Sequence, residues 1–232
     1  MAIIKSLPAG LFLLAGLLPA SALAEDHGHA PYAWGGRAEV DSLAGDSLRW
    51  EARAWVGDDR DRLLLRSEGE RDDGHAQTET WALLSHNVSM FWDAQGGMRA
   101  DSGPDGETYA VLGLEGLAPY FFDTEAHVFV SGHGRVSLRL HQSLDLLLTR
   151  KLVLQPRLEL NAGLGHVSGQ ALAGGLRDSE LGLRLRYELR REFAPYLELW
   201  RGRRHGGTAD WDKARGEASG DSGLRLGLML RF

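Results

Sequence analysis

The sequence contains no cysteine among its 232 residues. A disulfide framework, a thiolate metal cluster and a cysteine nucleophile are therefore excluded. An excess of positive charge is also missing, because 26 Lys and Arg stand against 32 Asp and Glu, for a formal net charge of −6. Since the chain also lacks a basic stripe interleaved with aromatic residues, these features argue against a nucleic-acid partner.

Long apolar runs are absent as well. No stretch of eighteen apolar residues occurs beyond residue 24, which excludes a membrane-spanning helix. The short apolar run Leu11–Leu18 follows Lys5 and precedes Ala22-Leu23-Ala24. This order is typical of a secretory signal peptide, which we expect over residues 1–24. We expect a short disordered tail over 25–34 and one domain over 35–232.

What the sequence has instead is alternation of apolar and charged residues. In the clearest segment, residues 181, 183, 185, 187 and 189 are Leu, Leu, Leu, Tyr and Leu, and four of the five residues that alternate with them are charged. A period of two belongs to a β-strand, whose successive side chains leave opposite faces. The same pattern predicts strands near 35–43, 47–57, 60–70, 75–87, 90–100, 106–117, 121–132, 135–147, 151–163, 178–190, 194–205 and 222–232.

Two all-β architectures fit alternating strands. In a soluble lipocalin-like barrel the leucines would face inward. In an outer-membrane barrel they would face lipid, and the charged residues would line a wet lumen. A face made almost entirely of leucine suits lipid better than an irregularly packed core. The sequence therefore favours an antiparallel transmembrane β-barrel of about twelve strands, with ten as the alternative, located in the cell outer membrane and contacting its lipid bilayer.

The connections between strands agree with this topology. Short turns are expected at Asn87–Met90, Leu117–Tyr120, Leu148–Arg150 and Arg190–Phe193, and we place them at the periplasmic end with the aromatic C-terminal residue Phe232. Outward loops are expected at Ser102–Asp105, Gly163–Arg177 and Gly206–Asp221. Short periplasmic turns and longer outer loops are usual in such barrels. Pro156, in the middle of a strand, predicts a local bulge because proline cannot donate to the ladder.

The inward positions carry many arginines and glutamates, which we expect to pair across the lumen. A barrel filled in this way is plugged rather than porous, although the sequence leaves open whether a path remains. The residues concerned are Arg49, Glu51, Arg53, Arg66, Glu68, Glu115, Arg157, Glu159, Arg184, Arg186, Glu188 and Arg225.

Several motifs resemble one known family. They include Trp55-Val56-Gly57, Phe91-Trp92-Asp93, the GLAPYFF segment at 116–122, the LQPRLELN segment at 154–161, and Gly206-Gly207-Thr208-Ala209. In order and over nearly the whole mature chain they resemble the CopB/PcoB family of outer-membrane copper resistance proteins. The resemblance implies a copper-tolerance barrel that binds copper, as Cu(II) or Cu(I), as cargo. It also implies a periplasmic copper protein as a partner and no catalytic chemistry.

One feature departs from that family. Its members commonly carry a long Met- and His-rich segment before the barrel, and here His27 and His29 are all that corresponds to it. The mature chain has only Met90, Met98 and Met229, so thioether ligands for Cu(I) are scarce. We expect any copper site to use imidazole and carboxylate groups, and His27 with His29 forms one candidate.

The lumen offers another candidate metal site. If a tight turn lies at Gly132–Gly134, residue 125 opposes 141 and residue 127 opposes 139. Glu125, His127 and His141 would then share the lumen face, and two imidazoles with a carboxylate suit Cu(II). The alternative is a lumen hydrogen-bond network that includes Asp123 and Asp145, and Arg139 between the histidines would repel a cation.

Three further histidines are weaker metal candidates at the outer rim, namely His133, His166 and His205. Gly165–Gly169 contains a serine and a histidine, but not at the spacing of a nucleophile elbow, so we expect no enzyme. The leading hypothesis is copper binding with movement across the outer membrane. The alternatives are a plugged barrel that sequesters copper or acts as a scaffold, and a lipid-modifying barrel enzyme.

Overall fold

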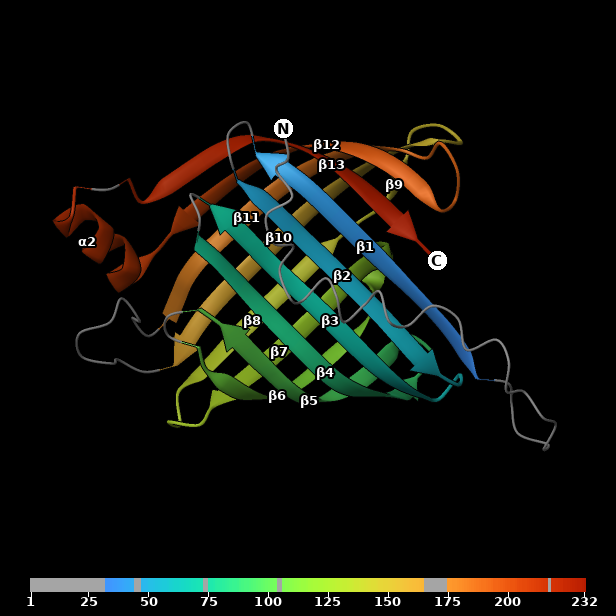
Figure 1. The fold of residues 1–232 in the computed structure, drawn as a ribbon, viewed down its shortest axis with the longest axis horizontal. Helices are drawn as coiled ribbons and strands as arrows, with labels where there is room; N and C mark the ends of the chain where they lie inside the picture. The colour runs from blue at the N-terminus through green and yellow to red at the C-terminus, as the bar shows by residue number, and fades with distance from the viewer. Residues whose placement is uncertain (1–31, 44–46, 73–74, 104–105, 165–174, 217) are drawn as a thin grey trace, which may run out of the picture.

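Twelve antiparallel strand positions form a closed barrel in the computed structural model, which describes residues 32–43, 47–72, 75–103, 106–164, 175–216 and 218–232 (Figure 1). The strands are β1 (Ala33–Leu43), β2 (Leu48–Gly57), β3 (Asp61–Asp72), β4 (His75–Ser89), β5 (Trp92–Ser102), β6 (Thr108–Ala118), β7 (Phe122–Ser131), β8 (Val136–Ser143), β9 (Leu146–Leu147), β10 (Leu152–Leu164), β11 (Gly175–Tyr187), β12 (Phe193–Arg204) and β13 (Gly220–Arg231).

The barrel closes because the first strand pairs with the last. β1 and β13 run antiparallel from the Arg37–Arg231 pair to the Leu43–Arg225 pair. β8 and β9 both pair with β10 and together occupy one position in the barrel. The predicted count of twelve is therefore confirmed, and each predicted strand corresponds to an observed position.

The break between β8 and β9 lies opposite Pro156. The Leu144 amide donates to the Pro156 carbonyl at 3.2 Å, but proline has no N–H with which to return the bond. Ser143 pairs with Arg157 and Leu146 with Leu154, so the register is the same on both sides of the break. The bulge predicted at Pro156 is wrong. The ladder is interrupted there without a shift, and the register shift of β10 lies between Asn161 and Ala162.

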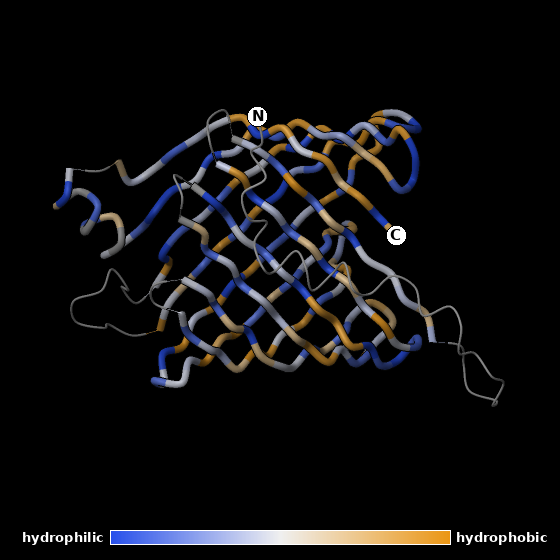
Figure 2. Tube along the Cα trace, viewed as in Figure 1, coloured by the Kyte–Doolittle hydropathy of each residue, from blue (hydrophilic) through white to orange (hydrophobic). Residues whose placement is uncertain are grey.

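The outer wall carries the leucines and the inner wall the charges. Leu181 and Leu199 are 59% and 57% exposed, whereas Arg184 and Arg186 are each 2% exposed. Hydrophobic and hydrophilic positions alternate along the strands in Figure 2. This arrangement is that of a membrane barrel, because a soluble barrel would place its leucines inside.

The two ends of the barrel differ. We call the end with Phe232 and the short turns the turn end, and the opposite end the loop end. At the turn end, the Trp34 and Phe232 rings lie 6.4 Å apart between centroids. The Pro119–Phe121 3₁₀ turn holds Tyr120 at a φ of 66°. Both aromatics of this turn are strongly exposed, as an interfacial belt requires.

The loop end contains a helix that the sequence pattern did not predict. Within the expected loop 206–221, helix α2 (Gly206–Ala214) projects beyond the barrel, at the left of Figure 1. Most of the expected loop 163–177 lies outside the described residues, and β11 already begins at Gly175. No helix among the described residues has the length and apolar character needed to cross a membrane.

Candidate functional site in the barrel lumen

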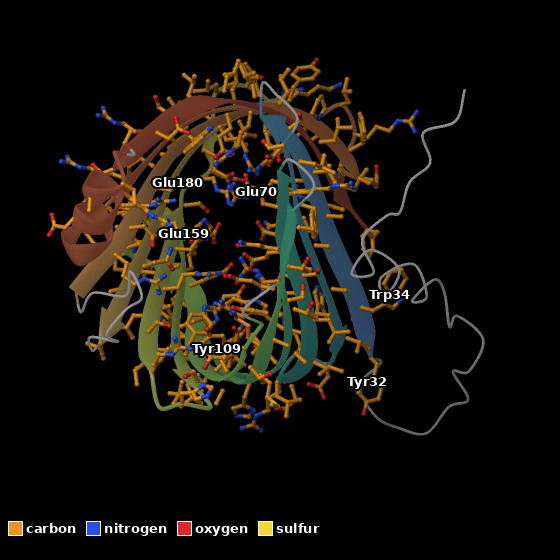
Figure 3. All side chains as sticks on the ribbon, turned by 60° about the vertical axis from the view of Figure 1, so that its left-hand side comes forward. Tyr32, Trp34, Glu70, Tyr109, Glu159 and Glu180 are labelled. Atoms are coloured by element: carbon orange, nitrogen blue, oxygen red, sulfur yellow. The ribbon has the colours of Figure 1, made fainter. Side chains whose placement is uncertain are left out.

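Arginine and glutamate side chains cross the lumen between distant strands. Arg53 on β2 pairs with Glu115 on β6 and lies 3.3 Å from Glu125 on β7. Arg66 on β3 lies 2.6 Å from Glu125 and also pairs with Glu68. Alternation aims these side chains inward, and closure of the barrel brings them together. Figure 3 shows Glu70, Glu159 and Glu180 inside the ring of strands, whereas Tyr32 and Trp34 lie outside it.

A second group of pairs joins β10–β12 to β1 and β2. Arg184 lies 2.6 Å from Glu39 and 2.7 Å from Glu198, and all three side chains are almost fully buried. The Arg184 guanidinium also stacks 3.9 Å from the centre of the Tyr196 ring, whose hydroxyl donates to Asp41 at 2.8 Å. Burial without a partner is costly for a charge, so these pairs fix the arrangement of this side of the lumen.

We use the name ion-pair belt for the lumen arginines and the carboxylates that pair with them. The pairing of arginines with glutamates across the lumen, which the sequence predicted, is confirmed. The belt comprises Arg53, Arg66, Arg139, Arg157 and Arg184 with Glu39, Glu51, Glu68, Glu79, Glu115, Glu125, Glu159 and Glu198.

The lumen also contains an apolar cluster. Leu64, Trp81, Leu83, Val111 and Phe129 are buried together on the inner face of β3–β7. The guanidiniums of Arg66, Arg99 and Arg139 lie 5.2, 5.7 and 5.5 Å from the Trp81 ring centre, within cation–π range. Sequence reasoning missed this cluster, although the inward position of Trp81 and Phe129 follows from their strand alternation.

Two polar cavities lie on either side of the belt. The turn-end cavity has a volume of about 370 Å³, and its lining includes Glu125, His141 and Arg157. The loop-end cavity has a volume of about 360 Å³, and its lining includes Glu68 and Arg139. Arg66 pairs with Glu125 of the first lining and Glu68 of the second. Side chains of the belt therefore separate the two cavities.

The structure places two of the three predicted lumen ligands side by side. Glu125 directly opposes His141, and His127 opposes Arg139, which is the predicted register. His141 is also flanked by Glu159 on β10, and its buried Nε2 atom makes no hydrogen bond. A signal for Glu159 was available, because it occupies an inward position on the next strand.

His127 is held apart from this pair by other contacts. Its Nε2 atom lies 2.9 Å from Gln95 Oε1, and its ring packs edge-on to Trp81 with centroids 5.3 Å apart. Glu125 is itself occupied by Arg53 and Arg66. As the side chains stand, the described part of the chain contains no group of three His, Asp or Glu side chains that could hold a metal ion.

The alternative lumen network involves one of the two aspartates that the sequence suggested. Asp145 accepts a hydrogen bond from Gln155 at 2.7 Å and pairs with Arg186 at 2.8 Å. Asp123 opposes Ser143 and lines the turn-end cavity. The histidines are not direct partners of Asp145 in these contacts.

Two of the rim histidines, His133 and His205, lie in separate settings. His133 Nδ1 lies 2.9 Å from Glu107, whose carboxylate also pairs with Arg135. Burial alone would raise the pKa of Glu107, but hydrogen bonds from His133, Ser131 and Tyr109 hold it below its ordinary value. His205 Nε2 lies within hydrogen-bond distance of the Ser179 hydroxyl, at 2.8 Å. His27, His29 and His166 lie outside the described residues.

Known proteins resemble this chain in sequence and in fold. Residues 35–232 match the family model described as "Copper resistance protein B precursor (CopB)". "Copper resistance protein B" of Escherichia coli is 42% identical over 174 residues, which cover 74% of this chain and 59% of that protein. "Copper resistance protein B homolog" of Pseudomonas syringae pv. tomato is 42% identical over 194 residues, covering 83% and 66%. The chain therefore spans about 59–66% of the length of these relatives.

Solved structures resemble the barrel itself. A KdgM porin matches with a TM-score of 0.53 at 13% identity, covering 85% of this chain and 99% of that one. A NanC porin matches with a TM-score of 0.53 at 12% identity and the same coverage. At this identity the likeness concerns the fold alone. The sequence matches and the closed barrel agree that this chain is an outer-membrane β-barrel that belongs to the copper resistance protein B family.

Proposed function

We propose that this protein contributes to copper resistance by binding copper ions as cargo and moving them across the outer membrane. The observation that carries the proposal is the pair of polar cavities at opposite ends of the lumen. The obstruction between them includes Arg66, which pairs with a carboxylate of each lining. Side chains can change partners without a change in the barrel, so an ion that competes for the carboxylates opens a route.

The ligands in this proposal are imidazole and carboxylate groups, which suit Cu(II). Glu125 and His141 are already neighbours, so copper would displace Arg53 and Arg66 from the Glu125 carboxylate. His127 would have to leave Gln95 to complete the predicted set, whereas Glu159 already flanks His141. The tail histidines His27 and His29 and the rim histidines His133, His166 and His205 are alternative ligands. A periplasmic copper protein is the partner that would supply or receive the ion.

A second candidate function is sequestration without transport. It is favoured by the burial of Arg184 with Glu39 and Glu198. Separating these side chains would leave buried charges without a partner, which is energetically costly. In this alternative the belt is a permanent plug and copper binds at one end of the barrel. Either copper function agrees with the names of the relatives, which are copper resistance proteins. A lipid-modifying enzyme is the third candidate.

Growth and flux experiments separate these functions. A deletion strain should lose copper tolerance if either copper function is correct, and unchanged tolerance would contradict both. Purified barrel in liposomes should then pass Cu(II) faster than protein-free liposomes if transport is correct. Binding of copper without flux would leave sequestration as the function.

A ligand experiment tests the lumen site directly. Copper would be titrated into the wild-type barrel, His141→Ala, His127→Ala and a chain that lacks residues 25–30. Loss of affinity in His141→Ala alone supports the site with Glu125 and Glu159, and loss in both histidine variants supports the predicted three-ligand set. Loss only on removal of residues 25–30 places binding in the tail, and full affinity in all variants excludes these sites. Binding should weaken at acidic pH, because protonated imidazole cannot ligate a metal.

A further inference from the structure

Two arginines stand on the outer wall where leucines would otherwise continue. The outward row of β12 reads Leu197, Leu199, Arg201, Arg203 toward the loop end. Arg201 pairs in register with Ser222, the first polar residue after the outward leucines of β13, and with Leu181, an outward leucine of β11. In Figure 2 the strands change from hydrophobic to hydrophilic colours as they approach α2.

Neither arginine is used by the protein itself. Arg201 and Arg203 are both exposed. Among the residues that the structure describes, neither side chain forms a hydrogen bond or an ion pair, unlike the lumen arginines, each of which has a carboxylate partner. Exposed guanidiniums immediately above a lipid-facing apolar surface lie at the height of lipid headgroups.

Polar groups next to Arg203 extend this surface. Arg203 pairs in register with Ser179, whose hydroxyl lies 2.8 Å from His205 Nε2. Successive outward residues of a strand lie about 7 Å apart. The guanidinium groups of Arg201 and Arg203 can therefore lie side by side. We call Ser179, Arg201, Arg203 and His205 the headgroup patch.

We propose that the headgroup patch binds the phosphate group of a membrane lipid in the leaflet at the loop end. Guanidinium forks match phosphate oxygens and bind them through paired charge-assisted hydrogen bonds. The acyl chains of the same lipid would lie against Leu199, the outward residue that precedes Arg201 on β12, and against Leu181, which lies beside Arg201 on β11. Because the arginines adjoin the lipid-facing leucines, this surface suits a phosphate that carries acyl chains better than free phosphate. The short turns at the other end of the barrel identify this leaflet as the outer one.

The two successive outward arginines of β12 are not repeated on β3. Four strand positions from β12 around the barrel, Arg71 of β3 is a single exposed outward arginine whose neighbours in register are Leu48 and Ala76. It lacks a second arginine on the same strand face, because the preceding outward residues are Gly69 and Ser67. Arg71 is therefore a matched control for exposed charge at the same end.

The test compares lipid binding by the full mature chain, refolded in neutral detergent, and its variants. The probe is phosphatidic acid in phosphatidylcholine nanodiscs, with binding measured by native mass spectrometry and by a fluorescent analogue. The wild-type barrel should retain phosphatidic acid over phosphatidylcholine. Arg201→Gln/Arg203→Gln should lower that affinity roughly thirtyfold, from about 1 kcal/mol for each arginine near an anionic surface. Arg71→Gln should change it little.

Other outcomes would overturn the proposal. Equal binding by wild type and the double variant excludes the patch, and an equal loss in Arg71→Gln shows general electrostatic attraction. Competition by inorganic phosphate at concentrations that match the lipid shows a free-phosphate site instead. Heat-modifiable migration checks that each variant is folded. We expect the Arg201→Gln/Arg203→Gln variant to fold, because neither arginine side chain forms an ion pair with the described part of the protein.

Discussion

The inner and outer walls of the barrel are built from the same strands but follow different rules. Leu183 on the outer wall of β11 opposes Pro156 and Leu199, and lipid can replace any of these contacts. Arg184, the next residue, is buried against Glu39 and Glu198. The outer wall therefore requires only apolar character, whereas the inner wall requires particular partners. Substitutions at these adjacent positions should fail for opposite reasons.

The largest effect should come from the inner wall. Arg184→Met would leave the buried Glu39 and Glu198 without their shared cation, because both lie within 2.7 Å of its guanidinium. We expect a loss of about 3–5 kcal/mol in the free energy of unfolding. Denaturant titration of the refolded barrel in detergent measures it.

The control for this variant is Arg225→Met, which removes a pair with Glu180 whose side chain is 31% exposed. Its effect should be smaller, because water can solvate the remaining carboxylate. Arg225 also lies 3.5 Å from Glu198, but that carboxylate keeps Arg184 as its closer partner. An Arg184→Met barrel as stable as wild type would show that the ion-pair belt contributes nothing to stability.

Leu183→Arg should break the outer wall by the reverse mechanism. A charge in the middle of the lipid-facing surface costs about 2–4 kcal/mol in a membrane barrel, while Leu183→Met should be nearly neutral. Folding into liposomes, followed by denaturant titration, measures both. Equal tolerance of arginine and methionine at residue 183 would contradict the assignment of this face to lipid.

Gly113→Ala should disturb one contact of the inner wall. A Cβ atom at Gly113 would lie 2.3 Å from the His127 ring and 2.9 Å from the Ala126 carbonyl oxygen. We expect a loss of about 1–3 kcal/mol from overpacking, with His127 displaced from Gln95. Gly96→Ala is the control, because its nearest neighbour would lie at 3.6 Å. Unchanged histidine NMR shifts in Gly113→Ala would refute the displacement.

The smallest effect concerns a polar contact at the rim. Glu107→Gln removes the carboxylate that contacts His133, Arg135 and Tyr109. We expect the free energy of unfolding to fall by less than about 1 kcal/mol at pH 7. Because the pKa of Glu107 is lowered in the folded protein, its contribution is complete above the ordinary value of about 4.3. It should disappear as pH falls through the lower folded value. Melting temperatures of wild type and variant should therefore converge in acid, and a difference independent of pH would contradict this account.

Local patterns explain which parts of the fold could be predicted. Alternation depends only on neighbouring residues, so it locates the strands and assigns Leu183 and Arg184 to opposite faces without any knowledge of distant contacts. The tight turn near Gly134 likewise fixes the opposition of Glu125 and His141. Helix α2 escaped prediction because its segment lies among glycines and charged residues without an apolar periodicity.

The alternation of residue types along the chain is enough to predict a two-faced barrel wall, the approximate strands, and a lumen lined with charges. The contacts of Arg53 with Glu125, 72 positions away, and of His127 with Gln95, 32 positions away, become known only from the closed barrel. The physical reason is that alternation specifies the face of each side chain but not its height in the barrel or its neighbour across the lumen. Those depend on the stagger of all the strands at closure, which no single segment of the chain encodes.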